Sequence, residues 1–540
     1  MISVQVSNPG LRPPRVFEVP ELLSLICSFA STSDCVLLSR TCKTVFKVST
    51  AFVWSNVDGG QFLLSLLGGT RIVDVQNTPG LKKIVIGIAS SSHVDFSRFE
   101  IYAPYVRRLS VYGPGPVGHY YQVDGWEHLI LRAQQRPLLP NLLSIILQSS
   151  CDGHGSDQLL WIKTFISPSL INIQATPHSV SSPPCVTSLM ADVIMDSIAE
   201  RCPRLFRLSI FPSRGPKQEE NNLLGYLRRR PYRESLRALP MLMELTCSVT
   251  MLEDSFSVIS SMPQLRRLIV LTSGTGIVLR PPILPRNSFP ALHQLHLKGL
   301  SPYEVIAILD VPPLMSQLTH LELKFKLYQL DEDEDREEWI ASDMFSLLKF
   351  SPNLQSLDLD LDPTMNLDQG YDIGHQDIMD TFSRLPLVNV TLGGVHLGDW
   401  AYTGSLKSVW PNVTSLRMRD QFASPRILSC FAQLPRVQYL LLDVHLEDFR
   451  EFPKVASLCP LHTLECSAGS STVCEPEQLD YTKRFLLALF PNLRTVVWPE
   501  DKGNDSPEFI SHKRFIGFLN QHIALKREVA AVKARFGVVD

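Results

Sequence analysis

The sequence of 540 residues lacks an excess of charge of either sign. Lys and Arg together number 51 and Asp and Glu number 54, which gives a formal net charge of −3 at pH 7. A dedicated nucleic-acid-binding domain has a basic footprint, and this balance does not provide one. We therefore expect no nucleic-acid partner.

Long apolar runs are also missing. No stretch approaches the ~18 uninterrupted apolar residues of a transmembrane helix, and the N-terminal residues contain no apolar segment of a secretory signal. The 11 cysteines are scattered and contain no CxxC pair, so neither a zinc ribbon nor a redox motif is expected. These absences predict a soluble protein of the cytoplasm, the nucleus or both, with no membrane partner, metal or cofactor.

Catalytic motifs are equally scarce. The sequence has no Gly-x-Ser-x-Gly, no HExxH and no P-loop. The segment Gly113–Gly118 matches G-x-G-x-x-G, but Pro114 and Pro116 remove two of the backbone donors that a phosphate loop needs. We therefore expect no catalytic residues, and an enzyme is the least supported of the possible functions.

Proline and leucine, by contrast, are abundant. Proline occurs 39 times, and roughly one residue in seven is leucine. Many of them belong to one phrase of eight residues: Pro, any, apolar, any, any, apolar, any, apolar. Its clean copies start at Pro79, Pro104, Pro140, Pro203, Pro240, Pro263, Pro290, Pro352, Pro411, Pro435 and Pro491. Weaker copies start at Pro168, Ser316, Pro386 and Pro460, and the mean spacing is about 29 residues.

The spacing of the phrase predicts a repeated strand. Its last two apolar positions are two residues apart and point to the same side of a strand, and proline is expected just before the strand, where its missing N–H costs least. Segments with helical spacing lie between the copies. The phrase resembles the core of leucine-rich repeats, although it lacks their Asn/Cys position. We therefore expect an α/β solenoid of parallel strands and helices over residues 58–500.

Residues 15–57 have a different pattern, which predicts three short helices. Pro20 suits the first turn of one helix, Ser33 or Asp34 is expected to cap the second, and Trp54 closes the segment. Three helices of this length make a marginal core, so some apolar side chains should remain exposed unless a partner covers them.

This segment resembles the F-box in Val19-Pro20-Glu21-Leu22-Leu23, Ile26, Leu37-Leu38, Arg40-Thr41-Cys42-Lys43 and Trp54. Val19 replaces the usual Leu of the family pattern. The resemblance implies a non-catalytic substrate receptor of a Skp–cullin–F-box ubiquitin ligase, which would bind a Skp-type adaptor, and through it a cullin, and would hold a protein substrate on its repeats. The implied adaptor contacts are Pro20, Glu21, Leu22, Leu23, Ile26, Leu37 and Leu38. The alternatives are a helical cap for the solenoid and a leucine-rich scaffold without ubiquitin chemistry.

The repeat phrase also predicts a binding surface. Side chains that flank the last apolar position should point away from the core, onto the concave face of a solenoid. The candidates for substrate binding are Tyr112, Phe211, His296, Lys298, Glu322, Lys324, Asp358, Asp360, Arg417 and Arg419. We further expect a flexible N-terminus over residues 1–14, an exposed acidic loop at Asp331–Glu338, and a helical cap over residues 501–540 with Ile510, Phe515, Phe518, Leu519, Ile523 and Leu525 covering the last repeat.

Overall fold

The computed structural model describes residues 19–78, 81–88, 94–112, 118–149, 155–177, 186–213, 232–272, 280–326, 343–362, 371–398, 400, 405–446, 459–467, 470–472, 476–498 and 507–536. The predicted flexible N-terminus, most of the glycine- and proline-rich segment from Gly113 and the acidic run at Asp331–Glu338 lie outside these residues. The contacts divide the chain into two units, and each is described by itself. Unit 1 comprises Met1–Val258 with Ser273–Thr275, and unit 2 comprises Ile259–Thr272 with Gly276–Asp540.

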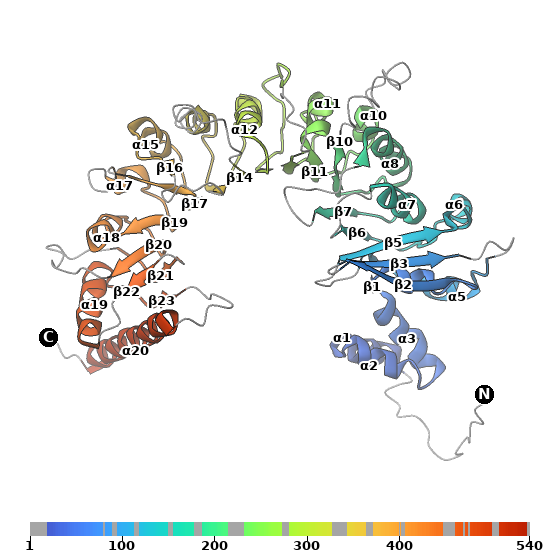
Figure 1. The fold of residues 1–540 in the computed structure, drawn as a ribbon, viewed down its shortest axis with the longest axis horizontal. Coiled ribbons are helices and arrows are strands. Elements are labelled where there is room, and N and C mark those ends of the chain that lie inside the picture. The colour runs from blue at the N-terminus through green and yellow to red at the C-terminus, as the bar shows by residue number, and fades with distance from the viewer. Residues whose placement is uncertain are drawn as a thin grey trace, which may run out of the picture. The chain divides into compact units, whose positions relative to one another are not determined.

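Unit 1 begins with three helices, α1 (Pro20–Phe29), α2 (Thr32–Leu38) and α3 (Lys43–Trp54) (Figure 1). The predicted cap of the second helix was wrong by two to three residues. Ser31 caps α2, and Asp34 is the third helical residue, whose carboxylate accepts the Ser31 backbone N–H in a capping box.

A ladder of parallel strands follows the helices in unit 1. Its order is β1 (Asn56–Asp58), β4 (Arg108–Ser110), β6 (Ser144–Ser149), β7 (Asn172–Pro177), β9 (Arg207–Ile210) and β11 (Glu244–Ser248). The connections contain α4 (Gly60–Leu64), α5 (Ser97–Tyr102), η2 (Ala103–Tyr105), α6 (Trp126–Gln135), α7 (Gly155–Phe165), the pair β8 (Val186–Thr187) and β10 (Pro212–Ser213), α8 (Ser188–Arg201), α10 (Tyr232–Arg237) and α11 (Val249–Ile259). The first strand has no proline phrase, so the sequence pattern missed it.

The first copy of the phrase, from Pro79, does not belong to this ladder. Its strand is β3 (Leu81–Gly87), which pairs antiparallel with β2 (Arg71–Thr78) and parallel with β5 (Gly118–Asp124) in a separate sheet. The prediction of a repeat strand here was wrong, because the phrase specifies one buried strand face and not the partner strand.

Unit 2 contains a longer parallel ladder. Its order is β12 (Arg267–Leu271), β13 (Gln294–Lys298), β14 (His320–Lys326), β15 (Ser356–Asp362), β17 (Asn389–Gly393), β19 (Ser415–Ala423), β20 (Tyr439–Leu446), β21 (Thr463–Cys466) and β23 (Thr495–Val497). Its connections contain α12 (Pro302–Leu309), α13 (Pro312–Met315), η3 (Leu348–Phe350), the pair β16 (Tyr371–Asp372) and β18 (Val395–His396), α15 (Gln376–Ser383), α17 (Leu406–Val409), α18 (Pro425–Phe431), β22 (Ser471–Thr472) and α19 (Pro476–Leu489), and α20 (Pro507–Phe536) ends the unit.

Two hydrogen bonds recur at the start of these strands. In the copy from Pro140, the N–H of Leu142 donates to the carbonyl of Leu139, which closes a turn with proline in its second position. The same bond joins Leu170 to Ser167, Leu205 to Cys202, Leu292 to Phe289, Leu354 to Ser351 and Leu493 to Phe490. Proline therefore occupies a turn that precedes the strand by several residues, and the expectation that it lies just before the strand was wrong.

The second recurring bond links each repeat to the next. The carbonyl of Arg107 accepts the N–H groups of Leu143 and Ser144, and the carbonyl of Leu143 accepts those of Ile171 and Asn172. In unit 2 the carbonyl of Thr319 likewise accepts the N–H groups of Gln355 and Ser356. Each strand is thus held to its neighbour before the regular ladder begins.

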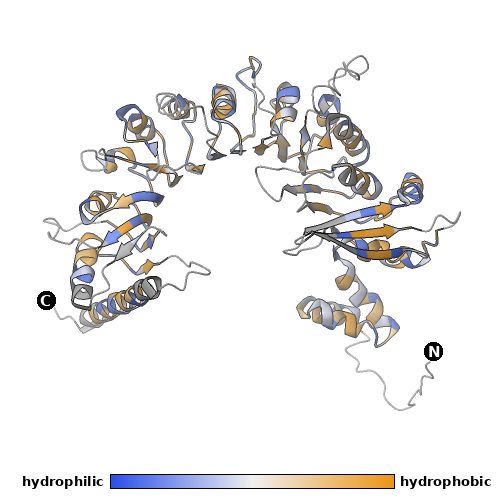
Figure 2. Ribbon diagram, in the orientation of Figure 1, coloured by the Kyte–Doolittle hydropathy of each residue, from blue (hydrophilic) through white to orange (hydrophobic). Residues whose placement is uncertain are grey.

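The cores lie between the strands and the helices. In β13 the leucines at 295 and 297 are fully buried, whereas Gln294, His296 and Lys298 between them are partly exposed. The helices between the strands of unit 2 lie along one face of these strands (Figure 1) and carry both apolar and polar residues (Figure 2). We call the opposite face of the unit 2 ladder the open face. Among the described helices, none is both long and apolar enough to cross a bilayer.

Candidate functional site

The N-terminal helices expose an apolar surface although their own core is complete. Leu23, Cys27, Cys35 and Val45 are buried together at the centre of α1, α2 and α3. Outside this core, large apolar side chains remain exposed on α1 and α2: Leu22 by 45%, Leu25 by 55%, Ile26 by 38%, Phe29 by 85% and Leu37 by 61%. Exposed apolar side chains on so small a module are typical of an interaction surface.

The structure separates the predicted adaptor contacts into two groups. Pro20, Glu21, Leu22, Ile26 and Leu37 are exposed. The prediction that Leu23 contacts a partner was wrong, because its side chain is fully buried in the module, and Leu38 is half-buried against the same core. Leu25 and Phe29 share the exposed surface, and the sequence pattern missed them because it follows the motif and not the helix surface.

The module is joined to the ladder without a free linker. The Trp54 ring stacks on Tyr102 with 4.7 Å between the ring centroids, and Phe46 contacts the edge of the same tyrosine. The carbonyl of Ser55 accepts the N–H groups of Arg107 and Arg108, both at 2.9 Å. The last helix of the module therefore passes directly into the first strand.

The open face of unit 2 brings together most of the predicted charged residues. Strand pairing places His296 opposite Glu322, Glu322 opposite Asp358, and Asp358 opposite Thr391. Thr391 in turn is paired with Arg417. A second row, two residues further along each strand, contains Lys298, Lys324 and Asp360. Strand pairing thus places these positions side by side from β13 to β19, and their role in substrate binding stays a prediction.

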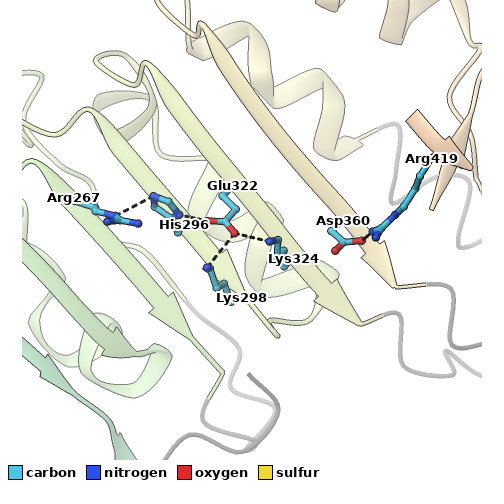
Figure 3. A network of polar contacts seen from close by, with 7 residues as sticks. All are labelled: Arg267, His296, Lys298, Glu322, Lys324, Asp360 and Arg419. Carbon is cyan, nitrogen blue, oxygen red and sulfur yellow. Dashed lines mark hydrogen bonds and ion pairs between the residues drawn. The ribbon is translucent and has the colours of Figure 1, made fainter. Parts of the chain in front are cut away.

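Glu322 is the centre of a network on this face (Figure 3). Its carboxylate accepts hydrogen bonds from Lys298 Nζ at 3.0 Å and from Lys324 Nζ at 2.9 Å. It also forms a hydrogen bond with His296 Nδ1. Arg267 Nε donates to His296 Nε2 at 3.2 Å, so the proton of the neutral imidazole lies on Nδ1, toward Glu322. The hydrogen bonds thus run from one strand to the next across β12, β13 and β14.

The network perturbs the pKa values of its members. Burial alone would raise the pKa of Glu322, but the hydrogen bonds from His296, Lys324 and Lys298 outweigh burial and hold the pKa well below its usual range. The bond to Glu322 raises the pKa of Lys324. Asp358 differs, because burial raises its pKa and its carboxylate has no hydrogen bond or ion pair within the described part of the chain. Asp358 is therefore the carboxylate of this row that is available to a cationic group.

A glycine separates the two charged groups of the next pair. Arg419 on β19 forms an ion pair with Asp360 on β15, although β17 lies between these strands (Figure 3). The β17 residue opposite Asp360 is Gly393. A Cβ atom at this position would lie 2.8 Å from Arg419 Nε and 2.9 Å from Asp360 Oδ1. The ion pair therefore requires a residue without a side chain at position 393.

A β-bulge in β19 directs Arg419 toward β15. The register between β19 and β20 shifts between Met418 and Phe422. The residues of the bulge are fixed by side-chain bonds to the backbone that follows β17: Asp420 accepts the Gly394 N–H at 2.6 Å and Gln421 accepts the Leu397 N–H at 2.7 Å. Arg419 thus projects from an anchored segment of the strand.

An aromatic and basic group lies beside this pair, and the repeat phrase predicted only part of it. The Arg417 guanidinium lies over the Tyr439 ring at 4.6 Å from the ring centroid. Phe422 stacks on His445 at 4.3 Å and remains 47% exposed. The sequence pattern missed Phe422 because the bulge changes the two-residue alternation after Met418.

Two predicted aromatic contacts were wrong. Tyr112 and Phe211 are buried in unit 1, with exposed fractions of 5% and 1%, and do not point onto an open face. Tyr112 stacks on Tyr121, a residue of the separate sheet. Both residues follow the last position of a short strand, β4 or β9, where the alternation of the strand no longer determines direction.

The fold defines the chain as an α/β protein in which parallel strands alternate with helices, consistent with a repeat solenoid. No family model matches the chain. No curated protein matches it in sequence either.

Proposed function

We propose that this chain is the substrate-recognition subunit of a Skp–cullin–F-box ubiquitin ligase in the cytoplasm, the nucleus or both. Helices α1 to α3 are the F-box and dock on a Skp-type adaptor, which connects the chain to a cullin. The parallel ladders are leucine-rich repeats, and the open face of unit 2 holds a protein substrate. The chain performs no chemistry and contributes proximity, which makes ubiquitin transfer effectively intramolecular.

One observation carries this proposal. The small module buries its own core and still exposes Leu22, Ile26 and Leu37, three of the positions at which it resembles the F-box. A structural cap for the ladder would direct such side chains toward the strands. Instead, the module contacts the ladder through Phe46 and Trp54 on α3, which leaves the apolar surface of α1 and α2 for a partner.

Direct binding to a purified Skp-type adaptor tests the proposal. Leu22→Asp and Leu37→Asp should weaken binding of the full chain at least about a hundredfold, since each places a charge in an apolar interface. Leu131→Asp, which alters an exposed leucine of α6, is the matched control and should bind as the wild type does. Circular dichroism shows whether each variant is folded.

Two results would refute the adaptor assignment. One is a folded wild-type chain that does not bind the adaptor. The other is full binding by both Leu22→Asp and Leu37→Asp. Either result would favour the alternative function, a repeat scaffold that binds a protein partner on its open face without ubiquitin chemistry.

A further inference from the structure

The C-terminal helix α20 has one face that is already occupied. Phe515, Ile516, Leu519 and Ile523 are buried, and the helix contacts β23 and α19. Asn520 replaces a further strand at the ladder edge, because its side-chain oxygen accepts the Val496 N–H at 2.8 Å and its amide donates to the Val496 carbonyl at 2.7 Å. This buried face agrees with the prediction that the helix covers the last repeat, and Ile523 is its last buried residue before position 530.

Beside this buried face, α20 carries exposed apolar side chains. Phe518 and Leu525 were predicted to help cover the last repeat, but their side chains are 55% and 59% exposed, so this part of the prediction was wrong. Val529 is 51% exposed, and every residue from Ala524 to Val529 is exposed. Between Ala524 and Val529 the helix thus buries none of its side chains in the described part of the chain.

The exposed residues have the spacing of a coiled coil. Phe518, His522, Leu525 and Val529 are separated by four, three and four residues, which is the spacing of the two core positions of a heptad. The sequence continues this spacing with Val532 and Phe536, and the helix extends to Phe536. In this register His522 occupies a core position, where a polar residue sets the alignment of two helices at a cost in stability.

The charges beside the stripe favour an identical, parallel helix. In a parallel pair, a residue that precedes a core position faces the residue five positions later on the other helix. Glu528 would then face Lys533 of the second copy, which is an attractive pair. An antiparallel pair would bring Lys526 and Lys533, which occupy equivalent flanking positions, toward each other and would be repulsive.

We propose that the exposed stripe of α20 pairs with α20 of a second copy of this chain, in parallel, and makes the protein a dimer. The proposal does not depend on the adaptor or on ubiquitin transfer. It assigns the exposed apolar side chains from Phe518 to Val529 to the dimer interface, and it assigns the neighbouring buried face, from Phe515 to Ile523, to the ladder.

Sedimentation of the full chain over a range of micromolar concentrations tests the proposal. The wild type should sediment as a dimer, and Leu525→Glu with Val529→Glu should raise the dimer dissociation constant at least about tenfold. Ala524→Glu, on the same turn but outside the stripe, is the matched control and should not change it.

A charge exchange tests the parallel arrangement. Glu528→Lys alone and Lys533→Glu alone should each weaken the dimer, and the double variant should restore it. A wild-type chain that stays monomeric at all concentrations would overturn the proposal, as would a dimer that persists in the Leu525→Glu, Val529→Glu variant. An absence of rescue in the double variant would overturn the parallel pairing. A monomer that binds an acidic helical peptide through the stripe would replace the second copy with another partner.

Discussion

Arg419 reaches Asp360 across the backbone of Gly393, so an ion pair joins β15 and β19 over the strand that separates them. The pair lies on the same face as the network around Glu322 (Figure 3). Contacts between strands thus hold the charged side chains of the open face in place. The direction of the Arg419 side chain also depends on Gly393, which carries no charge.

Gly393→Ala should break the ion pair, because the new Cβ would occupy the path of the Arg419 side chain. Since Arg419 and Asp360 are partly exposed, the pair itself contributes only about 0–1 kcal/mol. A double-mutant cycle of Asp360→Asn and Arg419→Gln in urea unfolding measures this coupling, which should vanish in the Gly393→Ala background. Gly87→Ala, at a strand position where a Cβ meets no neighbouring atom, is the control. Equal coupling in both backgrounds would contradict the role of Gly393.

Glu322→Gln should lower the free energy of unfolding by about 1–3 kcal/mol at pH 7, because it leaves Lys298 and Lys324 without their shared carboxylate. Because the pKa of Glu322 is lower in the folded state than in the unfolded state, its ionised form stabilises the fold at pH values above the ordinary pKa of a carboxyl group. This stabilisation is lost as the pH falls toward the pKa of Glu322 in the folded state. The difference between wild type and variant in urea unfolding should therefore shrink in strong acid. A difference that is independent of pH would contradict the ionic origin of the effect.

Asp192→Asn should stabilise unit 1 at pH 8. Burial, together with the charges of Asp196 and Asp254, raises the pKa of Asp192 from 3.8 to about 7. Since the folded state retains the proton longer than the unfolded state, the wild type loses stability as the pH rises from about 4 to about 7. Because Asp192 is only half-buried, the gain from the neutral variant is about 1–2 kcal/mol.

Unfolding at pH 4 and pH 8 measures this gain for Asp192→Asn. Glu200→Gln, an exposed change on the same helix α8, is the control and should give no such gain. A gain of equal size at both pH values would show that the carboxyl group does not titrate as expected.

Asn520→Ala should expose the edge of the unit 2 ladder. The N–H and the carbonyl of Val496 would both lose their hydrogen-bond partner, at a cost of about 1–3 kcal/mol. Amide hydrogen exchange should show faster exchange at Val496 in this variant. Gln521→Ala, an exposed neighbour on α20, should leave the exchange rate unchanged. Equal protection of Val496 in both variants would contradict the role of Asn520 as a substitute strand.

The sequence predicted much of the repeat architecture and less of the surfaces. The repeat phrase, in clean copies from Pro290 and Pro352 and a weaker copy from Ser316, predicted β13 to β15 together with the outward direction of His296, Glu322 and Asp358, because two-residue alternation determines both. It did not predict that Leu23 is buried while Leu22 is exposed, since helical neighbours of equal hydrophobicity differ only in the face they occupy. The sequence pattern also missed Phe422, because a β-bulge depends on how two strands pair, and the order of apolar and polar residues does not reveal this pairing.

Just before each of these strands, one carbonyl accepts two N–H groups from the next repeat, and this has a consequence for how such a chain can change in length. Any repeat can supply this carbonyl, and any repeat can supply the two amides, because these bonds join backbone groups. Deleting or duplicating a whole segment from one proline turn to the next would thus leave an intact set of backbone bonds on both sides of the junction. The number of repeats can therefore change during evolution while each remaining strand keeps a neighbour with which to pair. The outward-facing side chains can change independently of the repeat number.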